Sequence, residues 1–208
     1  MNHPIVFLDF DGVLNTEQYQ ARLTVDGKPT KDTWGPLFDP HAVESLRQIL
    51  DETNAQIVIS SSWRYAHSLD SLRMMWEVRG LPGEIRDTLA CGATYISRGE
   101  EIDCWLERNE RPDYVIIDDL DDFSPAQRDH YVETNPIVGI TEADAQKAIE
   151  ILQKSRAERR KLVVVPTNDG RLAVSHVIWW QNEVCANEIL NIFTGETYDD
   201  DDVILTTY

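Results

Sequence analysis

The residues with the clearest chemical potential in this chain are two carboxylates near its N-terminus. Asp9 and Asp11 directly follow the apolar run Ile5–Leu8, whose length and composition predict a buried strand. Because alternate residues of a strand face the same way, both carboxylates can point into one site where the strand ends. Gly12 allows the backbone to turn sharply there. Such a pair suits a magnesium ion, and it suits a carboxylate nucleophile with an acid/base partner.

Two other interpretations of this segment need to be weighed. One is an acidic turn in solvent after a core strand, and the segment alone does not exclude it. The other is a calcium loop of the EF-hand type, which places glycine at the sixth position and glutamate at the twelfth. Gly12 stands at the fourth position counted from Asp9, and no such series of ligands follows. Calcium is therefore disfavoured, and the case for magnesium depends on the rest of the chain.

A candidate phosphate site follows the next apolar strand, predicted over Gln56–Ile59. Ser60 and Ser61 end this strand and lead into Trp63 and Arg64. A hydroxyl and successive backbone N–H groups at a strand-to-helix junction can bind a phosphate. The alternative is that these serines only cap a helix.

Two more acids end a third apolar strand, predicted over Asp113–Ile117. Asp118 and Asp119 would repel one another at a sheet edge unless a cation lies between them and the first pair. Arg98 opens the helix that leads into this strand and could direct a guanidinium at a bound phosphate. Arg64 and Arg86 are alternative candidates for that role.

Strands and helices alternate around these residues. Asp39-Pro40 combines an N-cap residue with proline at the first helical position, which predicts a helix to about Thr53. Further helices are expected from about Ser68, over about 100–107, after Ser124-Pro125 and after Thr141, and a further strand at Tyr131–Thr134. Residues 16–38 lack clean periodicity and are predicted to form an ordered loop or flap. The alternation predicts an α/β fold, a Rossmann-like three-layer sandwich with a mostly parallel central sheet.

The pattern changes after about residue 158. Short strand-like runs follow, among them Leu162–Val165 and Leu172–Trp180, separated by the hairpin signal Asn168-Asp169-Gly170. The acidic run Asp199–Asp202 is predicted to be a solvated loop. We expect a catalytic domain over 1–158 and a small β-rich C-terminal extension over 159–208.

Composition excludes several classes of protein. The chain has 208 residues and a formal net charge of −18, which disfavours long nucleic acid as a partner because that binding depends on Lys and Arg. The charged segment Arg156–Lys161 could form a local basic patch and weaken this argument against nucleic acid. Three cysteines, Cys91, Cys104 and Cys185, are expected to be buried thiols in a protein without disulfides. No apolar run approaches the roughly 18 residues of a membrane span. We expect a cytoplasmic protein with no membrane partner; the oligomeric state is not predicted.

Taken together, the motifs resemble the haloacid dehalogenase (HAD) superfamily of aspartate-nucleophile phosphohydrolases. The first motif matches over Asp9–Val13, Ser60 matches the second, and Asp118-Asp119 fits the doubled-acid form of the fourth. Arg98 stands where the family more often has lysine. The resemblance covers about residues 4–155 and is strongest to the capless branch found in nucleic-acid repair and nucleotide-processing proteins.

The resemblance implies a mechanism for phosphomonoester hydrolysis. Asp9 would attack phosphorus and form an aspartyl-phosphate, while Asp11 would protonate the leaving oxygen and later activate water. Mg²⁺ would be held by Asp9, by the backbone carbonyl of Asp11, and by Asp118 or Asp119. Ser60, Ser61 and Arg98 would bind the phosphate oxygens. In this family an acid at the position of Asp11 marks phosphohydrolases, which favours a phosphatase over a dehalogenase.

The segments where the family carries a cap are short here, which predicts an open site for a nucleotide or another bulky phosphorylated substrate. An end-processing phosphatase of nucleic acid and a catalytically idle binding or regulatory module are the alternatives. A phosphoacceptor receiver domain is disfavoured, because it requires an adjacent acidic pair after the first strand and a lysine after a late strand.

Overall fold

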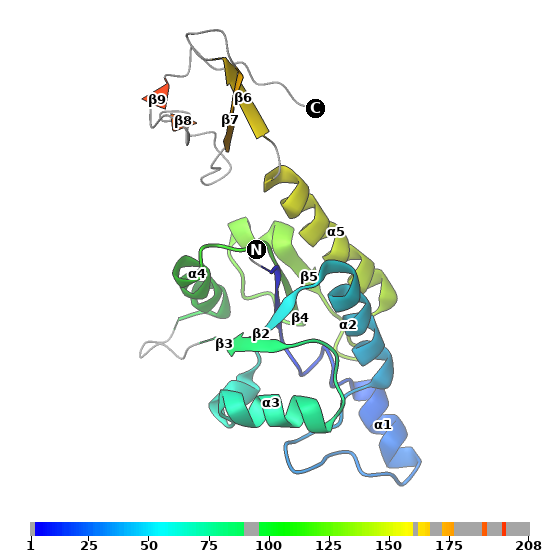
Figure 1. The fold of residues 1–208 in the computed structure, drawn as a ribbon. Helices are drawn as coiled ribbons and strands as arrows, with labels where there is room; N and C mark the ends of the chain where they lie inside the picture. Colours follow the sequence, from blue (N-terminus) through cyan, green and yellow to red (C-terminus); the bar gives the residue numbers. More distant parts are fainter. Residues whose placement is uncertain are drawn as a thin grey trace. The chain divides into compact units, whose positions relative to one another are not determined.

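A parallel five-stranded sheet forms the centre of the first of two structural units in the computed structural model of this chain (Figure 1). The units are Met1–Lys154 and Ser155–Tyr208. The structure describes residues 3–89 and 96–159, with side chains to 155, and the strand residues 162–166, 172–176, 189–190 and 197–198.

The strand order of this sheet sets the place of the site. The order is β3-β2-β1-β4-β5, and every neighbouring pair is parallel. The strands are β1 (Ile5–Leu8), β2 (Gln56–Ile59), β3 (Ile85–Thr88), β4 (Tyr114–Asp118) and β5 (Tyr131–Glu133). The chain runs outward from β1 in one direction and then returns to its other side with β4. Ligands of open α/β sheets bind at the carboxyl ends of the strands where the order reverses in this way.

Five α-helices accompany the sheet in the described part of the first unit. They are α1 (Glu17–Val25), α2 (Pro40–Thr53), α3 (Leu69–Val78), α4 (Arg98–Arg108) and α5 (Glu142–Arg159), with 3-10 turns η1 (Ser62–Tyr65) and η2 (Pro125–His130). The helix predicted after Asp39 forms as expected, since the Asp39 carboxylate accepts a hydrogen bond from the His41 N–H at 2.9 Å. Asn54 ends it in the left-handed conformation, with φ of 54°.

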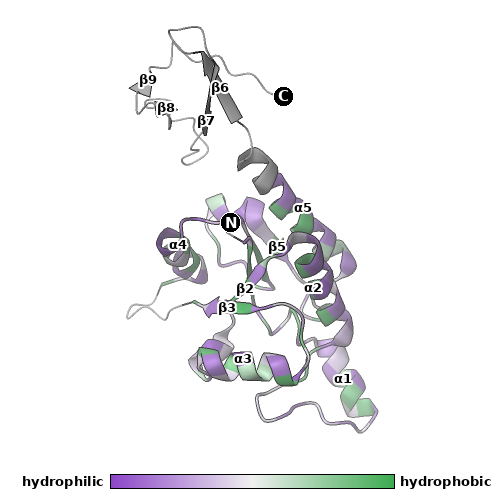
Figure 2. Cartoon of the chain, in the orientation of Figure 1, coloured by the Kyte–Doolittle hydropathy of each residue, from purple (hydrophilic) through white to green (hydrophobic). Residues whose placement is uncertain are grey.

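The helices cover both faces of the sheet, giving three layers. The core on one face joins Leu8 and Ile57 to residues of α2, α3 and α5, and the core on the other joins Phe7 and Val58 to α4. In Figure 1, α4 lies across the sheet from α2 and α5. Figure 2 shows hydrophobic and hydrophilic residues mixed along α3 and α5, as expected for helices with one face on the core. The predicted Rossmann-like α/β fold is confirmed.

Two elements differ from the sequence-based expectation. The segment predicted as a loop over 16–38 contains α1, capped by Thr16, whose hydroxyl accepts a hydrogen bond from the Tyr19 N–H at 3.1 Å. Leu23 is the one buried residue of α1, so the helix has no apolar stripe to reveal it. The edge strand β3 was not expected, and only Ile85 of its four residues is buried. A third correction concerns Cys104, which is exposed on α4 rather than buried.

The second unit contains two antiparallel strand pairs among its described residues. β6 (Leu162–Pro166) pairs with β7 (Leu172–His176), and β8 (Ile189–Leu190) pairs with β9 (Thr197–Tyr198). The expected turn at 168–170, the acidic run 199–202, Cys91 and Cys185 lie outside the described residues. The domain boundary near residue 158 stays a prediction. None of the helices in the described part of the chain has the length and apolar character needed to cross a membrane.

Candidate active site

Strand register brings three of the predicted residues to one level of the sheet. Leu8 of β1 pairs with Ile59 of β2 and with Ile117 of β4, so the next residues, Asp9, Ser60 and Asp118, lie side by side at the carboxyl ends. Backbone hydrogen bonds continue to this level, from the Asp9 N–H to the Ile117 carbonyl at 3.1 Å and from the Ser60 N–H to the Leu8 carbonyl at 3.0 Å. Asp9 therefore occupies the centre of the site, between the two neighbouring strands.

Arg98 joins the two buried acids of this level. Its Nη1 donates to Asp9 Oδ2 at 2.6 Å and also donates to Asp118 Oδ2. The second oxygens of both acids accept backbone hydrogen bonds, from the Phe10 N–H at 2.7 Å and from the Leu120 N–H at 3.0 Å. All four carboxylate oxygens are thus held by donors, which fixes the orientation of Asp9 and Asp118.

The N-terminus of α4 positions Arg98. Ser97 caps the helix in a capping box with Glu100, and the Asp122 carboxylate accepts a hydrogen bond from the Arg98 N–H at 2.9 Å. Gly99 permits a close approach here, since a Cβ at this position would lie 2.6 Å from Gln127 Oε1. Asp122 is a supporting residue that sequence patterns did not reveal.

The pKa values of the site residues indicate that the site carries more negative than positive charge. Burial and the charge of Asp9 raise the pKa of Asp118 to about 6, against the opposing effect of Arg98. The pKa of Asp119 is raised for the same two reasons. Burial disfavours the charged form of Arg98, but the charges of Asp9 and Asp118 outweigh it and raise the pKa of the guanidinium. One arginine does not balance three acids, so the site would gain from a further cation.

The turn after β1 brings Asp119 into the same cluster. Gly12 has φ of 73°, and a methyl group there would collide with the Asp119 carboxylate. The Gly12 carbonyl accepts a hydrogen bond from Thr134 Oγ1 at 2.9 Å, which ties the turn after β1 to the end of β5. As a result Asp9, Asp118 and Asp119 offer carboxylate oxygens that all lie within 4.8 Å of one another.

Asp11 lies apart from this cluster. Its carboxylate is exposed and accepts two hydrogen bonds, from Asn15 Nδ2 to Oδ1 at 2.7 Å and from Trp63 Nε1 to Oδ2 at 3.0 Å. The sequence did not predict that Trp63 and Asn15 donate hydrogen bonds to Asp11. Asn15 stands four residues after Asp11, but Trp63 is 52 residues away in the chain, and no local pattern pairs it with an acid.

The remaining predicted residues have distinct places. Ser60 is fully buried, and its Oγ has no hydrogen-bond partner among the described residues. Ser61 is also buried and its hydroxyl accepts a hydrogen bond from the Trp63 N–H at 3.4 Å. Of the three candidate arginines, Arg64 is paired with buried Glu101 and Arg86 lies over the Trp105 ring. Arg98 is the one of the three that contacts Asp9.

Removing the charge of Asp119 should stabilise the metal-free protein. Asp119→Asn relieves the unfavourable ionisation that burial and Asp9 impose on this carboxyl, and we expect the melting temperature to rise by about 1–3 °C. The same variant should lose the upward shift that added Mg²⁺ gives the wild type. Thermal unfolding with and without MgCl₂ measures both effects.

Asp121→Asn is the matched control for this prediction. Asp121 is two residues away and forms an exposed ion pair with Arg128, which contributes little to stability. Its Mg²⁺ response should equal that of the wild type. An Asp119→Asn protein that is less stable without metal, or that keeps the full Mg²⁺ shift, would contradict the assigned role of the cluster.

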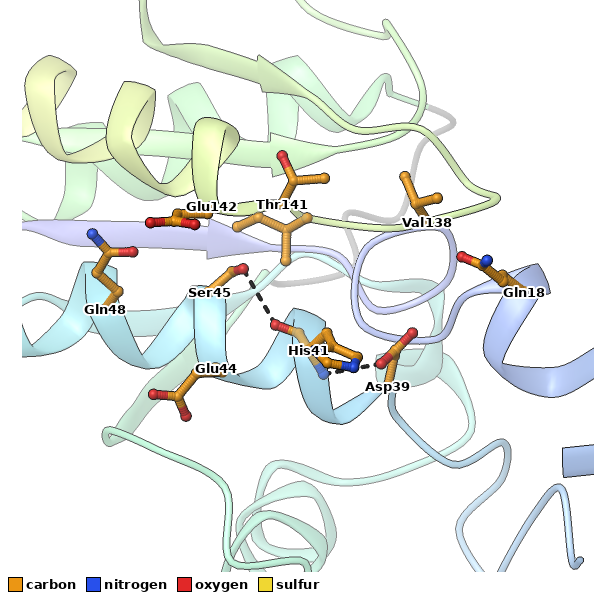
Figure 3. Close-up of a pocket in the computed structure, with 10 residues that line it drawn as sticks. Gln18, Asp39, His41, Glu44, Ser45, Gln48, Val138, Thr141 and Glu142 are labelled. Atoms are coloured by element: carbon orange, nitrogen blue, oxygen red, sulfur yellow. Dashed lines mark hydrogen bonds between the residues drawn. The ribbon is translucent and has the colours of Figure 1, made fainter. Parts of the chain in front are cut away.

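Two pockets lie in the described part of this unit. The larger, of about 610 Å³, lies at the N-termini of α2 and α5, and Asp39, His41, Glu44 and Glu142 are among the residues that line it (Figure 3). None of the described residues that line it is Lys or Arg, which disfavours a phosphate there. The smaller, of about 340 Å³, is lined by Asp11 and Asn15 and by Glu17 and Gln20 of α1, among others.

Comparison with known proteins agrees with the fold and with the motifs. The model of one protein family, described as the HAD domain in Swiss Army Knife RNA repair proteins, matches residues 5–145. This range contains every element of the parallel sheet and all the site residues described above. Neither the curated proteins nor the solved structures contain a significant match. The match covers more than half of the chain and confirms the resemblance expected from the sequence: the protein belongs to the HAD-domain family of Swiss Army Knife RNA repair proteins.

Proposed function

We propose that this protein is a Mg²⁺-dependent phosphomonoester hydrolase that forms an aspartyl-phosphate on Asp9. The observation that carries the proposal is the environment of the Asp9 carboxylate. It lies at the switch point of the sheet, touches the guanidinium of Arg98, and shares a cluster with Asp118 and Asp119. A cation beside a carboxylate nucleophile lowers the repulsion that an incoming phosphate dianion would meet.

The residues present fit a magnesium ion. The cluster of Asp9, Asp118 and Asp119 offers only oxygen donors, which hard divalent cations prefer. The pKa values of Asp118 and Asp119 are raised by burial and then by the charge of Asp9, so the fold holds these acids where a cation would favour their charged forms. When bound there, Mg²⁺ would offset this charge and polarise the phosphoryl group.

The protein's own groups supply the remaining chemistry. An oxygen of Asp9 would form a bond to phosphorus while the bond from phosphorus to the leaving oxygen breaks, and Asp11 would donate a proton to that oxygen. In the second half, Asp11 would take a proton from water as the water attacks phosphorus, which releases phosphate and restores Asp9. Arg98 and the Ser60 hydroxyl, which has no partner in the described part of the chain, would donate to the phosphate oxygens.

The proposed substrate is a nucleotide or the phosphorylated end of a nucleic acid. The described chain has only α1 and α2 between β1 and β2, and η1 and α3 between β2 and β3, which leaves the site open to bulky molecules. The family description names RNA repair proteins, and this supports a phosphate at an RNA end. The net charge of −18 argues that such an RNA would be held near its end and not along its length.

Phosphate release from a substrate panel tests the proposal. The panel comprises an aryl phosphate, mononucleotides, sugar phosphates, and oligoribonucleotides with a 5′- or 3′-phosphate, each with MgCl₂ or with EDTA. We expect Mg²⁺-dependent release, with nucleotides or oligonucleotide ends preferred over sugar phosphates. If no member of the panel releases phosphate, the alternative of a catalytically idle binding module replaces the proposal.

Ser60→Ala should separate binding of phosphate from stability. The hydroxyl is buried and has no hydrogen-bond partner among the residues that the structure describes, so its removal should leave the melting temperature unchanged or slightly higher. Phosphate release should fall about 10²-fold, because one donor to the transferring phosphoryl group is lost.

Ser45→Ala is the control for Ser60→Ala. The Ser45 hydroxyl donates to the His41 carbonyl on α2 at 3.2 Å, away from the acids, and its loss should leave phosphate release unchanged. Full activity of Ser60→Ala, or its loss together with a large drop in melting temperature, would argue against a direct role for the hydroxyl.

A further inference from the structure

We propose that Trp63 and Asn15 are positioning residues that hold the Asp11 carboxylate in the orientation needed for proton transfer. The inference rests on the proposed function, in which Asp11 is the acid and base. Asp11 itself is exposed, and an exposed carboxylate samples several rotamers unless neighbours restrain it. General acid catalysis requires the proton to be delivered at a defined place.

Both oxygens of Asp11 are held by a side-chain donor. Asn15 Nδ2 lies 2.7 Å from Oδ1, and Trp63 Nε1 lies 3.0 Å from Oδ2. One donor is close to Asp11 in the sequence and the other is 52 residues away. Together the two bonds fix the plane of the carboxylate. Each oxygen has a second lone pair, so both can still exchange a proton with a leaving group or a water.

The geometry of Asn15 is not explained by stability alone. Its own Oδ1 is buried and has no hydrogen-bond partner among the described residues, which costs free energy. The turn holds its backbone, with the Asn15 N–H donating to the Phe10 carbonyl at 2.8 Å and the Gly12 N–H donating to the Asn15 carbonyl at 2.9 Å. The side chain is thus presented to Asp11 by a fixed backbone.

The indole of Trp63 is itself immobilised. Its ring packs edge-on against Phe10, with centroids 5.4 Å apart, and lies 5.7 Å from the Phe38 ring. Gly35 makes room for it, since a Cβ there would come within 2.8 Å of the indole. With 9% of its surface exposed, the indole has one position from which its N–H can reach Asp11.

Arg79, the C-cap residue of α3, also contacts the Trp63 ring. Its guanidinium lies 5.7 Å from the Trp63 ring and 4.6 Å from the Phe38 ring. It also binds both oxygens of Asp32 at 2.8 and 3.0 Å and the Gly35 carbonyl at 3.2 Å. The segment between α1 and α2 is thereby fastened over the tryptophan that holds Asp11.

Leaving-group dependence reports this function specifically. An acid is needed most when the departing oxygen is strongly basic, so misplacing Asp11 should slow phenyl phosphate more than para-nitrophenyl phosphate. A substitution that only loosens the fold would slow both alike. The slope of log kcat/KM against the pKa of the leaving phenol therefore separates a positioning role from a structural one, because kcat/KM reports phosphoryl transfer and not the later hydrolysis that all substrates share.

The experiment compares Trp63→Phe and Asn15→Ala with the wild type and with Trp76→Phe, in the full chain with MgCl₂. Trp76 is the matched control, because its indole packs against the same phenylalanines and donates to the Pro82 carbonyl at 2.9 Å, away from Asp11. Both test variants should lose at least about tenfold in kcat/KM on phenyl phosphate and much less on para-nitrophenyl phosphate. Trp76→Phe should keep the wild-type slope.

Asn15→Ala keeps the test available if Trp63→Phe fails to fold, since it removes a donor without disturbing the aromatic cluster. Wild-type slopes in the folded test variants would overturn the inference and leave the hydrolase proposal standing. An equal loss of kcat/KM on both substrates would also overturn it. A wild type that hydrolyses neither substrate would overturn the proposed function, and the inference with it.

Discussion

Asp9→Asn should abolish phosphate release, with kcat lowered by ~10⁴-fold or more. An amide cannot attack phosphorus as the carboxylate can, and no other described group takes the central place between Ser60 and Asp118. Asparagine would also turn an amide N–H₂ toward Arg98, because Oδ1 of residue 9 accepts the Phe10 N–H. The rate should therefore be measured together with the melting temperature, over the same substrate panel.

An exposed acid provides the comparison for this variant. Asp129 is exposed on η2, and Asp129→Asn changes the net charge by the same amount without touching the cluster. It should release phosphate as the wild type does. Comparable activity in Asp9→Asn would remove Asp9 from the reaction.

Arg64→Ala should destabilise the protein by about 3–5 kcal/mol, because it leaves a buried carboxylate without its partner. The side chains of Arg64 and Glu101 are 3% and 6% exposed. Arg64 also donates to the carbonyls of Ser60 and Ser61, so it joins the candidate phosphate segment to the helix that carries Arg98. The midpoint of urea unfolding at constant slope measures the loss.

Two further variants show whether the loss comes from the unpaired charge. Arg47→Ala removes an exposed pair with Glu44 and should cost no more than about 1 kcal/mol. Combining Arg64→Met with Glu101→Leu should recover much of the stability, because it removes both buried charges. An Arg64→Ala protein as stable as the Arg47→Ala protein would show that the buried pair contributes nothing.

The sequence was most informative where local rules decide the structure. The run Ile5–Leu8 is fully buried as predicted, since four apolar residues in succession suit a strand covered on both faces. The helix after Asp39 begins and ends where its caps place it. Parallel strands that each end in a polar residue were enough to predict that Asp9, Ser60 and Asp118 share one edge.

The elements that were missed lack a local signal. α1 buries a single residue, and β3 is a polar edge strand with one buried residue, so neither shows an apolar periodicity. The bond from Trp63 to Asp11 depends on how η1 packs against the turn after β1, and this is decided by tertiary structure. For the same reason, sequence alone could not decide which arginine meets Asp9.

The most direct test of the central claim is to identify the residue that becomes phosphorylated. Wild-type protein is mixed with a phosphomonoester that it hydrolyses and MgCl₂, quenched in acid during turnover, and treated with borohydride, which reduces an acyl phosphate to the alcohol. Peptide mass spectrometry should then find homoserine in place of Asp9, with Asp11, Asp118 and Asp119 unchanged. Homoserine at another position, or unmodified peptides from protein that is turning over, would contradict the assignment of Asp9 as the nucleophile.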